Sequence, residues 1–334
     1  MWPRTELACA FPTSLDAPDH IALAEELGYA RARLYDTPQQ SPDVWMMLAL
    51  AAQRTSRIGL GPGVLVPSLR HPMVNAAATA ALAALAPGRV AVAFGTGFSG
   101  RRAMGYGPVP WDFMAAYLDA YRGLLRGDEV VWEGARMRML HPPGHGAPRP
   151  VVVPILVGAL GPKGDAVARS RADGLYAVGR PPAFATAYRW VAFLAWGTVL
   201  DAGEDRSGER VRAAAGPGVV VAYHTTYKHA GAEAVRALPG GDAWLDVVAR
   251  IPADRRHLAA HTGHLVELNE ADTAAWHASG SILLTRLTLS GTAEEVRERI
   301  DELASEGVTE LVFQLGGLDI RRELARFLEA AQSR

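Results

Sequence analysis

The glycine-rich turn GALGPKGD, residues 158–165, has the composition of a phosphate-binding site. It follows an apolar run that predicts a strand, and it leads into a predicted helix ending at Arg171. Glycine lets a ligand approach the backbone, proline suits the first helical turn, and the free N–H groups there attract an anion. A glycine turn that serves only packing is the alternative. The candidate phosphate contacts are Gly158, Ala159, Gly161, Pro162, Lys163 and Gly164, with Gly179 at the end of the next strand as a further candidate.

Other predicted strand ends carry residues suited to binding or catalysis. Asp36 closes an apolar strand, where a carboxylate can hydrogen-bond a cofactor or act as an acid or base with a raised pKa. Gly61 and Gly63 in GPGV permit backbone geometry that other residues resist. Thr96 and Gly97 in GTG can line a cavity. An ordinary turn or strand end is the alternative at each of these positions.

Histidines supply the remaining candidates. His71 begins a predicted helix and is either a catalyst or a structural histidine. Farther along, His224, His261 and His264 are predicted to contact the substrate, with ordinary lid structure as the alternative. The HTGH run places two imidazoles three residues apart, which is a weak metal signal, so we expect no metal.

Composition favours one large globular domain that spans residues 1–334. Hydrophobic residues make up 49% of the chain and charged residues 21%, and no apolar run reaches the ~18 residues of a membrane span. A net charge of −1 gives no electrostatic case for nucleic acid. The beginning of the chain has no apolar core long enough for a secretion signal, and Cys9 is the only cysteine. We therefore expect a cytoplasmic protein with a small-molecule substrate.

Strand and helix patterns alternate along the chain and predict an α/β fold, a (β/α)8 TIM barrel, although a doubly wound open sheet also fits locally. Residues 184–200 read as a helix. Residues 224–289 exceed a simple barrel connection and predict an insertion after strand 7 that covers the mouth as a lid. The predicted strands are 7–11, 32–35, 58–66, 90–94, 151–157, 174–178, 219–223 and 311–315.

Six motifs follow one another along the chain. They are LYDTPQ at 34–39, GPGVLVPSLRHP at 61–72, GRVAVAFGTG at 88–97, VGALGPKG at 157–164, ADGLYAVG at 172–179 and GTAEEVRERIDELASEGVTELVF at 291–313. In this order they resemble the bacterial luciferase-like oxidoreductases. The resemblance is greatest to their deazaflavin (coenzyme F420)-dependent branch, typified by methylenetetrahydromethanopterin reductase. It implies a barrel with an insertion that binds F420 or reduced FMN at its carboxyl-terminal mouth.

The resemblance also assigns roles to particular residues. It implies that the cofactor phosphate binds at 158–164 and that a cis peptide bond at Gly63–Val64 supports the bend of the cofactor ring. It implies a homodimer through helices near the second and third strands, where the alanines of 76–84 allow close approach. One departure is Thr37, because histidine commonly follows the acidic residue at this point in the deazaflavin enzymes.

The expected function is hydride transfer between F420 and a small organic substrate. An FMN-dependent monooxygenase that uses dioxygen is the alternative, because both activities would share one site. A cofactor-free barrel is a third possibility, and the glycines retained at the phosphate turn count against it.

Overall fold

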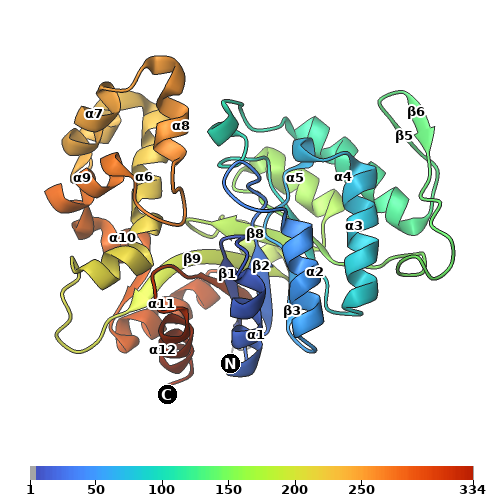
Figure 1. The fold of residues 1–334 in the computed structure, drawn as a ribbon, viewed down its shortest axis with the longest axis horizontal. Coiled ribbons are helices and arrows are strands. Elements are labelled where there is room, and N and C mark those ends of the chain that lie inside the picture. The colour runs from blue at the N-terminus through green and yellow to red at the C-terminus, as the bar shows by residue number, and fades with distance from the viewer. Residues whose placement is uncertain (1–4, 334) are drawn as a thin grey trace.

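Eight parallel strands form the centre of the structure, a computed structural model that describes residues 5–333 (Figure 1). Their order is β3-β2-β1-β11-β9-β8-β7-β4. Parallel bridges from Leu60 to Val90 and from Leu65 to Phe94 join the two edges, so the sheet is a nearly closed barrel and the predicted α/β barrel is confirmed. The strands are β1 (Glu6–Phe11), β2 (Arg31–Leu34), β3 (Gly59–Pro62), β4 (Val92–Phe94), β7 (Ile155–Val157), β8 (Gly174–Val178), β9 (Val191–Val199) and β11 (Glu310–Gln314).

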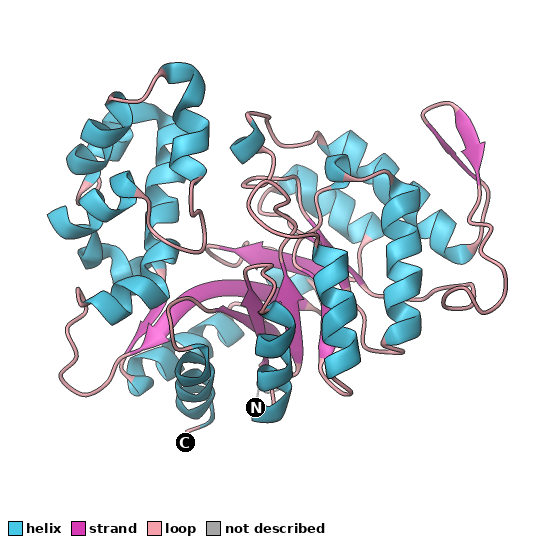
Figure 2. Cartoon of the chain, viewed as in Figure 1, coloured by secondary structure: helices cyan, strands magenta, loops and turns pink. Residues whose placement is uncertain are grey.

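Helices cover the outside of the barrel, and Figure 2 shows them flanking the central strands. Both faces of the strands are therefore buried, which is why their apolar residues are consecutive. Alternate residues, among them Ala10, Ala93 and Val312, form a separate cluster inside the barrel. The covering helices are α1 (Ala17–Leu27), α2 (Val44–Arg54), α3 (Pro72–Leu85), α4 (Trp111–Arg126), α5 (Pro162–Arg171), α11 (Ala293–Ser305) and α12 (Ile320–Gln332).

Short elements connect the barrel parts. The hairpin of β5 (Val130–Trp132) and β6 (Ala135–Met137) follows α4, and β10 (Leu289–Gly291) pairs with the end of β9. Single turns of 3-10 helix lie at 67–69, 102–104, 185–187, 253–255 and 280–283.

The structure corrects two sequence predictions. Residues 191–199 are the strand β9 and not part of a helix at 184–200, and residues 219–223 lie in a helix and are not the seventh strand. Every residue of β9 is buried. The run at 219–223 is apolar because its helix packs against β9 on one side and other helices on the other. A short apolar run does not distinguish a buried strand from a buried helix, so periodicity failed at both places.

Five helices between β9 and β10, residues 209–287, form a group that we call the helical unit. It begins before residue 224, so the predicted boundary of the insertion was too late. Figure 1 shows the unit grouped at one side of the barrel, and Trp244 and Trp276 belong to its own apolar cluster. Its helices are α6 (Glu209–Arg236, interrupted at Gly231 where φ is 81°), α7 (Gly241–Ala249), α8 (Arg256–His261), α9 (Glu270–Ala278) and α10 (Leu284–Leu287).

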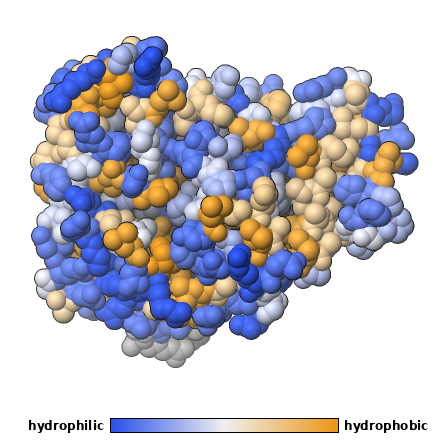
Figure 3. Space-filling view, viewed as in Figure 1, coloured by the Kyte–Doolittle hydropathy of each residue, from blue (hydrophilic) through white to orange (hydrophobic). Residues whose placement is uncertain are grey.

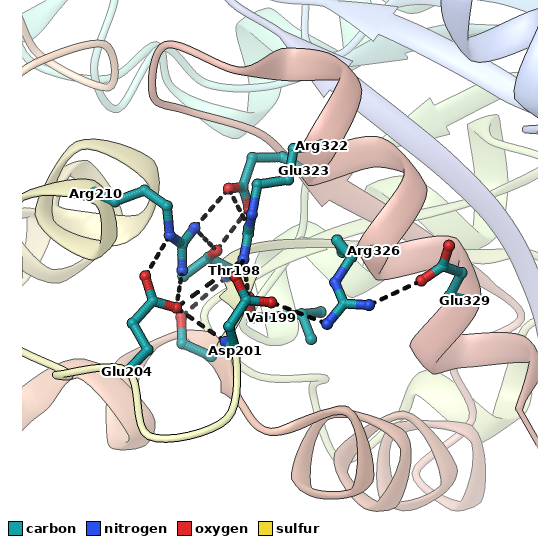
Figure 4. Close-up of polar contacts among 10 residues, drawn as sticks. Thr198, Val199, Asp201, Glu204, Arg210, Arg322, Glu323, Arg326 and Glu329 are labelled. Atoms are coloured by element: carbon teal, nitrogen blue, oxygen red, sulfur yellow. Dashed lines mark hydrogen bonds and ion pairs between the residues drawn. The ribbon is translucent and has the colours of Figure 1, made fainter.

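A network of ion pairs fastens the start of the helical unit to the barrel (Figure 4). Glu323 of α12 is buried and accepts from Thr198 Oγ1 at 2.6 Å and from Arg210 Nη1 at 2.7 Å. Arg322 also donates to Glu323, at 2.8 Å. Because Thr198 is on β9 and Arg210 on α6, this carboxylate connects three elements.

The described residues also bear on membrane insertion. No helix within 5–333 combines the length and the apolar composition needed to cross a lipid bilayer.

Candidate active site at the barrel mouth

The carboxyl ends of neighbouring strands meet at one rim of the barrel. Gly63 N–H donates to the Leu34 carbonyl at 2.8 Å, and Gly158 N–H donates to the Phe94 carbonyl at 2.8 Å. Gly95 N–H donates to the Leu65 carbonyl at 2.9 Å. These bonds bring the ends of β2, β3, β4 and β7 together, as the glycine breaks predicted.

The structure separates the glycines of the phosphate turn into two kinds. Gly161 precedes α5, whose start has no side-chain cap, and an added Cβ there would meet no atom within 4 Å. Gly179 has φ +83° and likewise borders open space. Gly164 is different, because a Cβ would lie 2.7 Å from the Trp111 ring. Gly161 and Gly179 therefore leave room for a ligand, whereas Gly164 serves the packing of α5 against α4.

The other residues of this turn frame the same space. A Cβ on Gly158 would lie 3.4 Å from the Phe94 carbonyl, which is ordinary contact. Ala159 is buried, while Pro162 and Lys163 are exposed. The Lys163 ammonium is thus held in solvent, where a charge contributes little to binding.

The segment that follows β3 lies directly beside the end of β4. The Gly63–Val64 peptide bond is cis, as the resemblance implied. A Cβ on Gly95 would lie 2.6 Å from Val64 Cγ2, and a Cβ on Gly61 would lie 1.8 Å from the Ala91 carbonyl oxygen. Gly61 and Gly95 therefore allow β3 and β4 to approach closely. Gly63 faces the barrel interior, because its Cβ would lie 2.9 Å from Tyr176 Oη.

Three polar side-chain atoms on the barrel strands are buried and have no hydrogen-bond partner among the described residues. They are Tyr176 Oη, Trp196 Nε1 and Gln314 Oε1. An unpaired buried polar group costs about 1–3 kcal/mol, so such atoms are available to a ligand. Sequence reasoning missed all three, although an amide at 314 within the apolar strand ELVFQ was a usable signal.

Asp36 is committed to an ion pair. Its side chain is 1% exposed, and Arg70 Nη1 donates to Oδ2 at 2.6 Å. Arg70 Nη2 also donates to Asp43 Oδ2 at 2.7 Å. Burial raises the pKa of Asp36 above its ordinary value, while the Arg70 guanidinium favours the charged form. The pair fixes the loop after β2, and the predicted catalytic role of Asp36 stays a prediction.

The remaining candidates on the barrel have local structural roles. His71 is exposed and caps α3, since its Nδ1 accepts from Met73 N–H at 3.1 Å. Its catalytic role stays a prediction. Thr96 is partly buried and its carbonyl accepts from Val109 N–H at 2.9 Å. Gly97 has φ +86° and turns the chain beside Arg101.

The helical unit contacts the rim at the loops that follow β2 and β4. Tyr35 Oη donates to the Leu265 carbonyl at 3.5 Å, and Gln40 donates to the His261 carbonyl. Leu265 packs against the interior cluster, and its bond from Tyr35, at the end of β2, places it over the mouth. Arg102 Nη2 lies 3.0 Å from His229 Nε2. These contacts place the unit at the same end of the barrel as the glycine breaks.

Two of the predicted substrate-contact histidines are buried in hydrogen bonds. His224 and His264 lie with their Nδ1 atoms 3.1 Å apart, and His264 Nε2 is 3.0 Å from Ser99 Oγ. His261 Nδ1 donates to the His257 carbonyl at 2.7 Å. Among the residues described, no three His, Cys, Asp or Glu side chains are placed to hold a metal ion.

Arg102 is a buried cation that the sequence did not single out. The residue is 6% exposed, and its guanidinium lies 4.0 Å from the Phe98 ring centroid. Its Nε has no hydrogen-bond partner in the described part of the chain. Within 5–333 no carboxylate oxygen is within 4.0 Å of it. A buried charge without a counter-ion is destabilising, so the Arg102 guanidinium would favour the binding of an anionic group beside it.

A cavity of about 260 Å³ lies between the barrel and the helical unit. It extends from Gly179, at the end of β8, along β9 to α6 and α10. Its polar lining includes Thr225, Thr226, Thr285 and Arg286. The cavity therefore adjoins one of the two glycines that border open space.

Comparison with known proteins gives consistent relatives. The family described as luciferase-like monooxygenase matches residues 12–310. The 5,10-methylenetetrahydromethanopterin reductase of Archaeoglobus fulgidus is 27% identical over 313 residues, covering 88% of this chain and 87% of that protein. The F420-dependent glucose-6-phosphate dehydrogenase of Beutenbergia cavernae is 33% identical over 171 residues, 46% of this chain. The chain spans about half the length of that relative (50%) and of an uncharacterised Mycobacterium tuberculosis protein (46%), which is also 33% identical.

Solved structures agree with the fold. The coenzyme F420-dependent tetrahydromethanopterin reductase of Methanopyrus kandleri superposes with a TM-score of 0.64 at 19% identity, over 96% of this chain and 97% of that one. At this identity the likeness concerns the fold, and the superposition covers nearly the whole of both chains.

Proposed function

Because this chain belongs to the luciferase-like monooxygenase family, whose members are flavin- or deazaflavin-dependent oxidoreductases, we propose that it transfers hydride between coenzyme F420 and a small organic substrate. A relative that aligns along most of the chain is a methylenetetrahydromethanopterin reductase, and a relative that aligns over half of its own length is named as F420-dependent. These names support the deazaflavin over a flavin.

The observation that carries the proposal is the open space beside Gly161 and Gly179. Backbone N–H groups at the uncapped start of α5 would hold the cofactor phosphate. Tyr176 Oη and Gln314 Oε1, buried without partners, would meet the polar edge of the ring beside Gly63–Val64. The residues present therefore fit the cofactor. When bound, the deazaflavin supplies a carbon that accepts or donates hydride.

The protein's own residues prepare the site for this chemistry. The Asp36–Arg70 pair fixes the loop after β2, and Leu265 with the helical unit keeps water from the interior of the mouth. Exclusion of water strengthens every polar contact within the site.

A monooxygenase that uses FMN and dioxygen is the second candidate. The description of the matching family favours it, and so does Thr37, which stands where histidine is common in the deazaflavin enzymes. The same phosphate turn would serve either cofactor.

Titration of the purified protein with each cofactor, followed by fluorescence, tests the proposal. We expect F420 to bind tightly and to be turned over without oxygen. Tight binding of FMN with oxygen-dependent turnover, and no binding of F420, would instead support the monooxygenase.

We also propose that the protein is a homodimer. Met46 and Leu50 of α2 and Val74 of α3 are exposed, at 64%, 44% and 52%. Figure 3 shows apolar residues gathered where Figure 1 draws these two helices. An apolar surface of this kind is typical of an interface between subunits.

A further inference from the structure

A chain of hydrogen bonds connects a buried carboxylate with a hydroxyl at the barrel mouth. Asp272 Oδ1, on α9, is 2.8 Å from His224 Nε2, on α6. His224 Nδ1 is 3.1 Å from His264 Nδ1, and His264 Nε2 is 3.0 Å from Ser99 Oγ. Asp272, His224 and His264 are 0%, 7% and 3% exposed, whereas Ser99 is only partly buried. Ser99 is therefore the end of the chain open to a ligand.

The carboxylate sets the direction of every bond in this chain. Trp244 Nε1–H can only donate, and it donates to Asp272 Oδ1 at 2.9 Å, so this oxygen is an acceptor and also takes the Nε2–H of His224. With the proton on Nε2, His224 has Nδ1 free to accept the Nδ1–H of His264. His264 Nε2 is left as an acceptor for the Ser99 hydroxyl.

Both imidazoles nearest the mouth are neutral at pH 7. Burial, with the neighbouring imidazoles of His224 and His261, lowers the pKa of His264 well below its ordinary value. Burial also lowers the pKa of His261 to about 4, and Arg102 and Lys228 add to this from the loop after β4 and from α6. A lone pair on His264 Nε2 is therefore present at neutral pH.

The open end of the chain lies at the site described above. Ser99 follows Gly97 by two residues in the loop after β4. Leu265, next to His264, packs with Val64 against the interior cluster. The glycines on either side of it, Gly97 and Gly100, lie against Val66 of the loop after β3, so the hydroxyl belongs to the rim.

We propose that Ser99 and His264 transfer the proton of an alcohol substrate, which is oxidised to a carbonyl compound as hydride passes to the cofactor. This inference rests on the proposed function. The C–H bond breaks with its electron pair, and the O–H bond breaks as its proton moves to Ser99 Oγ. The Ser99 proton moves to His264 Nε2, and the C=O bond forms. His224 and Asp272 are positioning residues that stabilise the imidazolium.

The hydrogen-bonded chain is tested first in the cofactor-free protein. In the proton NMR spectrum we expect downfield imidazole N–H signals for the His224–His264 and His224–Asp272 bonds. His264→Gln should remove the first signal, and Ser99→Ala should keep both. Absence of these signals from the folded wild-type protein would overturn the proposal.

Kinetics with F420 and a series of alcohols then test the role. Ser99→Ala and His264→Gln should each lower kcat about 100-fold, with F420 binding unchanged, because general base catalysis contributes 10²–10⁴-fold. Asp272→Asn should lower kcat and move the acid limb of its pH profile to lower pH. His277→Gln is the matched control, since His277 is exposed on the same helix and contacts Arg212.

The outcomes separate this inference from the proposed function. Wild-type kcat in Ser99→Ala, or an unchanged pH profile in Asp272→Asn, would contradict the proton-transfer role while F420 binding and turnover persist. Failure of the wild type to bind F420 would contradict the proposed function and this inference with it.

Discussion

Replacement of Gly161 by leucine tests the phosphate turn without disturbing the fold around it. An added Cβ meets no atom of the described residues within 4 Å, and the φ of −137° is open to any residue. Glycine is favoured over leucine at an N-cap, so the change should lower the free energy of unfolding by about 0.5–1 kcal/mol. We therefore expect the Tm of the cofactor-free variant to stay within about 2 °C of the wild type.

The effect on cofactor binding should be large. The leucine side chain fills the space through which a phosphate reaches the N–H groups at the start of α5, which no side chain caps. Hydrogen bonds to a charged group contribute about 1.5–3 kcal/mol each, and loss of two raises the Kd roughly 100-fold to 10,000-fold. Lys163→Ala removes a single exposed charge, so its Kd should rise by less than about fivefold.

Fluorescence titration of wild type and variants with F420, and separately with FMN, gives the Kd values. Gly164→Ala is the control for packing, because a Cβ lies 2.7 Å from Trp111 and should lower the Tm. Equal losses of affinity in Gly161→Leu and Lys163→Ala would refute a backbone site in favour of a side-chain one. Unchanged affinity in Gly161→Leu would refute a phosphate site at this turn.

Three further predictions concern stability and assembly. Arg102→Met removes a buried cation that has no carboxylate partner among the described residues. The free energy of unfolding by urea should therefore rise by about 1 kcal/mol. A fall would instead show that His229 and Phe98 stabilise the guanidinium. The folded-state pKa of His261 is about 4, below its ordinary value of 6.5. As the pH falls, the unfolded state therefore takes up the proton before the folded state does, and the free energy of unfolding should fall between pH 6.5 and pH 4. His261→Gln should flatten this part of a Tm-against-pH curve, and a curve as steep as the wild type's would assign the loss to other groups. Met46→Glu places a charge on the exposed face of α2, so light scattering should give the mass of one chain, and an unchanged dimer would place the interface elsewhere.

The barrel and its mouth were predictable because glycine breaks recur at one end of successive strands. The seventh strand was not, since β9 and residues 214–220 of α6 are both continuous buried runs, which periodicity does not distinguish. The composition of the phosphate turn indicated a site but did not separate Gly161, beside open space, from Gly164, against Trp111. That distinction depends on α4, which is distant in the sequence.

Side-chain partners were the least predictable part. His224 and His264 were chosen as candidates, but their connection through Asp272 and Ser99 joins four segments between residues 99 and 272. The pairing of Asp36 with Arg70 likewise depends on how the loops after β2 and β3 meet. Local patterns report which residues are unusual, whereas their partners are determined by the tertiary fold.

The ion-pair network around Glu323 attaches the base of the helical unit to the barrel more strongly than the rim contacts attach its other end. At its base, one buried carboxylate holds Thr198, Arg210 and Arg322 together, whereas the rim contacts of Tyr35, Gln40 and Ser99 are single hydrogen bonds. Each of these hydrogen bonds breaks at a cost of about 1 kcal/mol, so the rim contacts should open before the ion-pair network at the base does. The helical unit should therefore rotate as one body about the contacts of Arg210 at its base. The widest gap opens along the loops after β2 and β4, which is the side from which a substrate would enter.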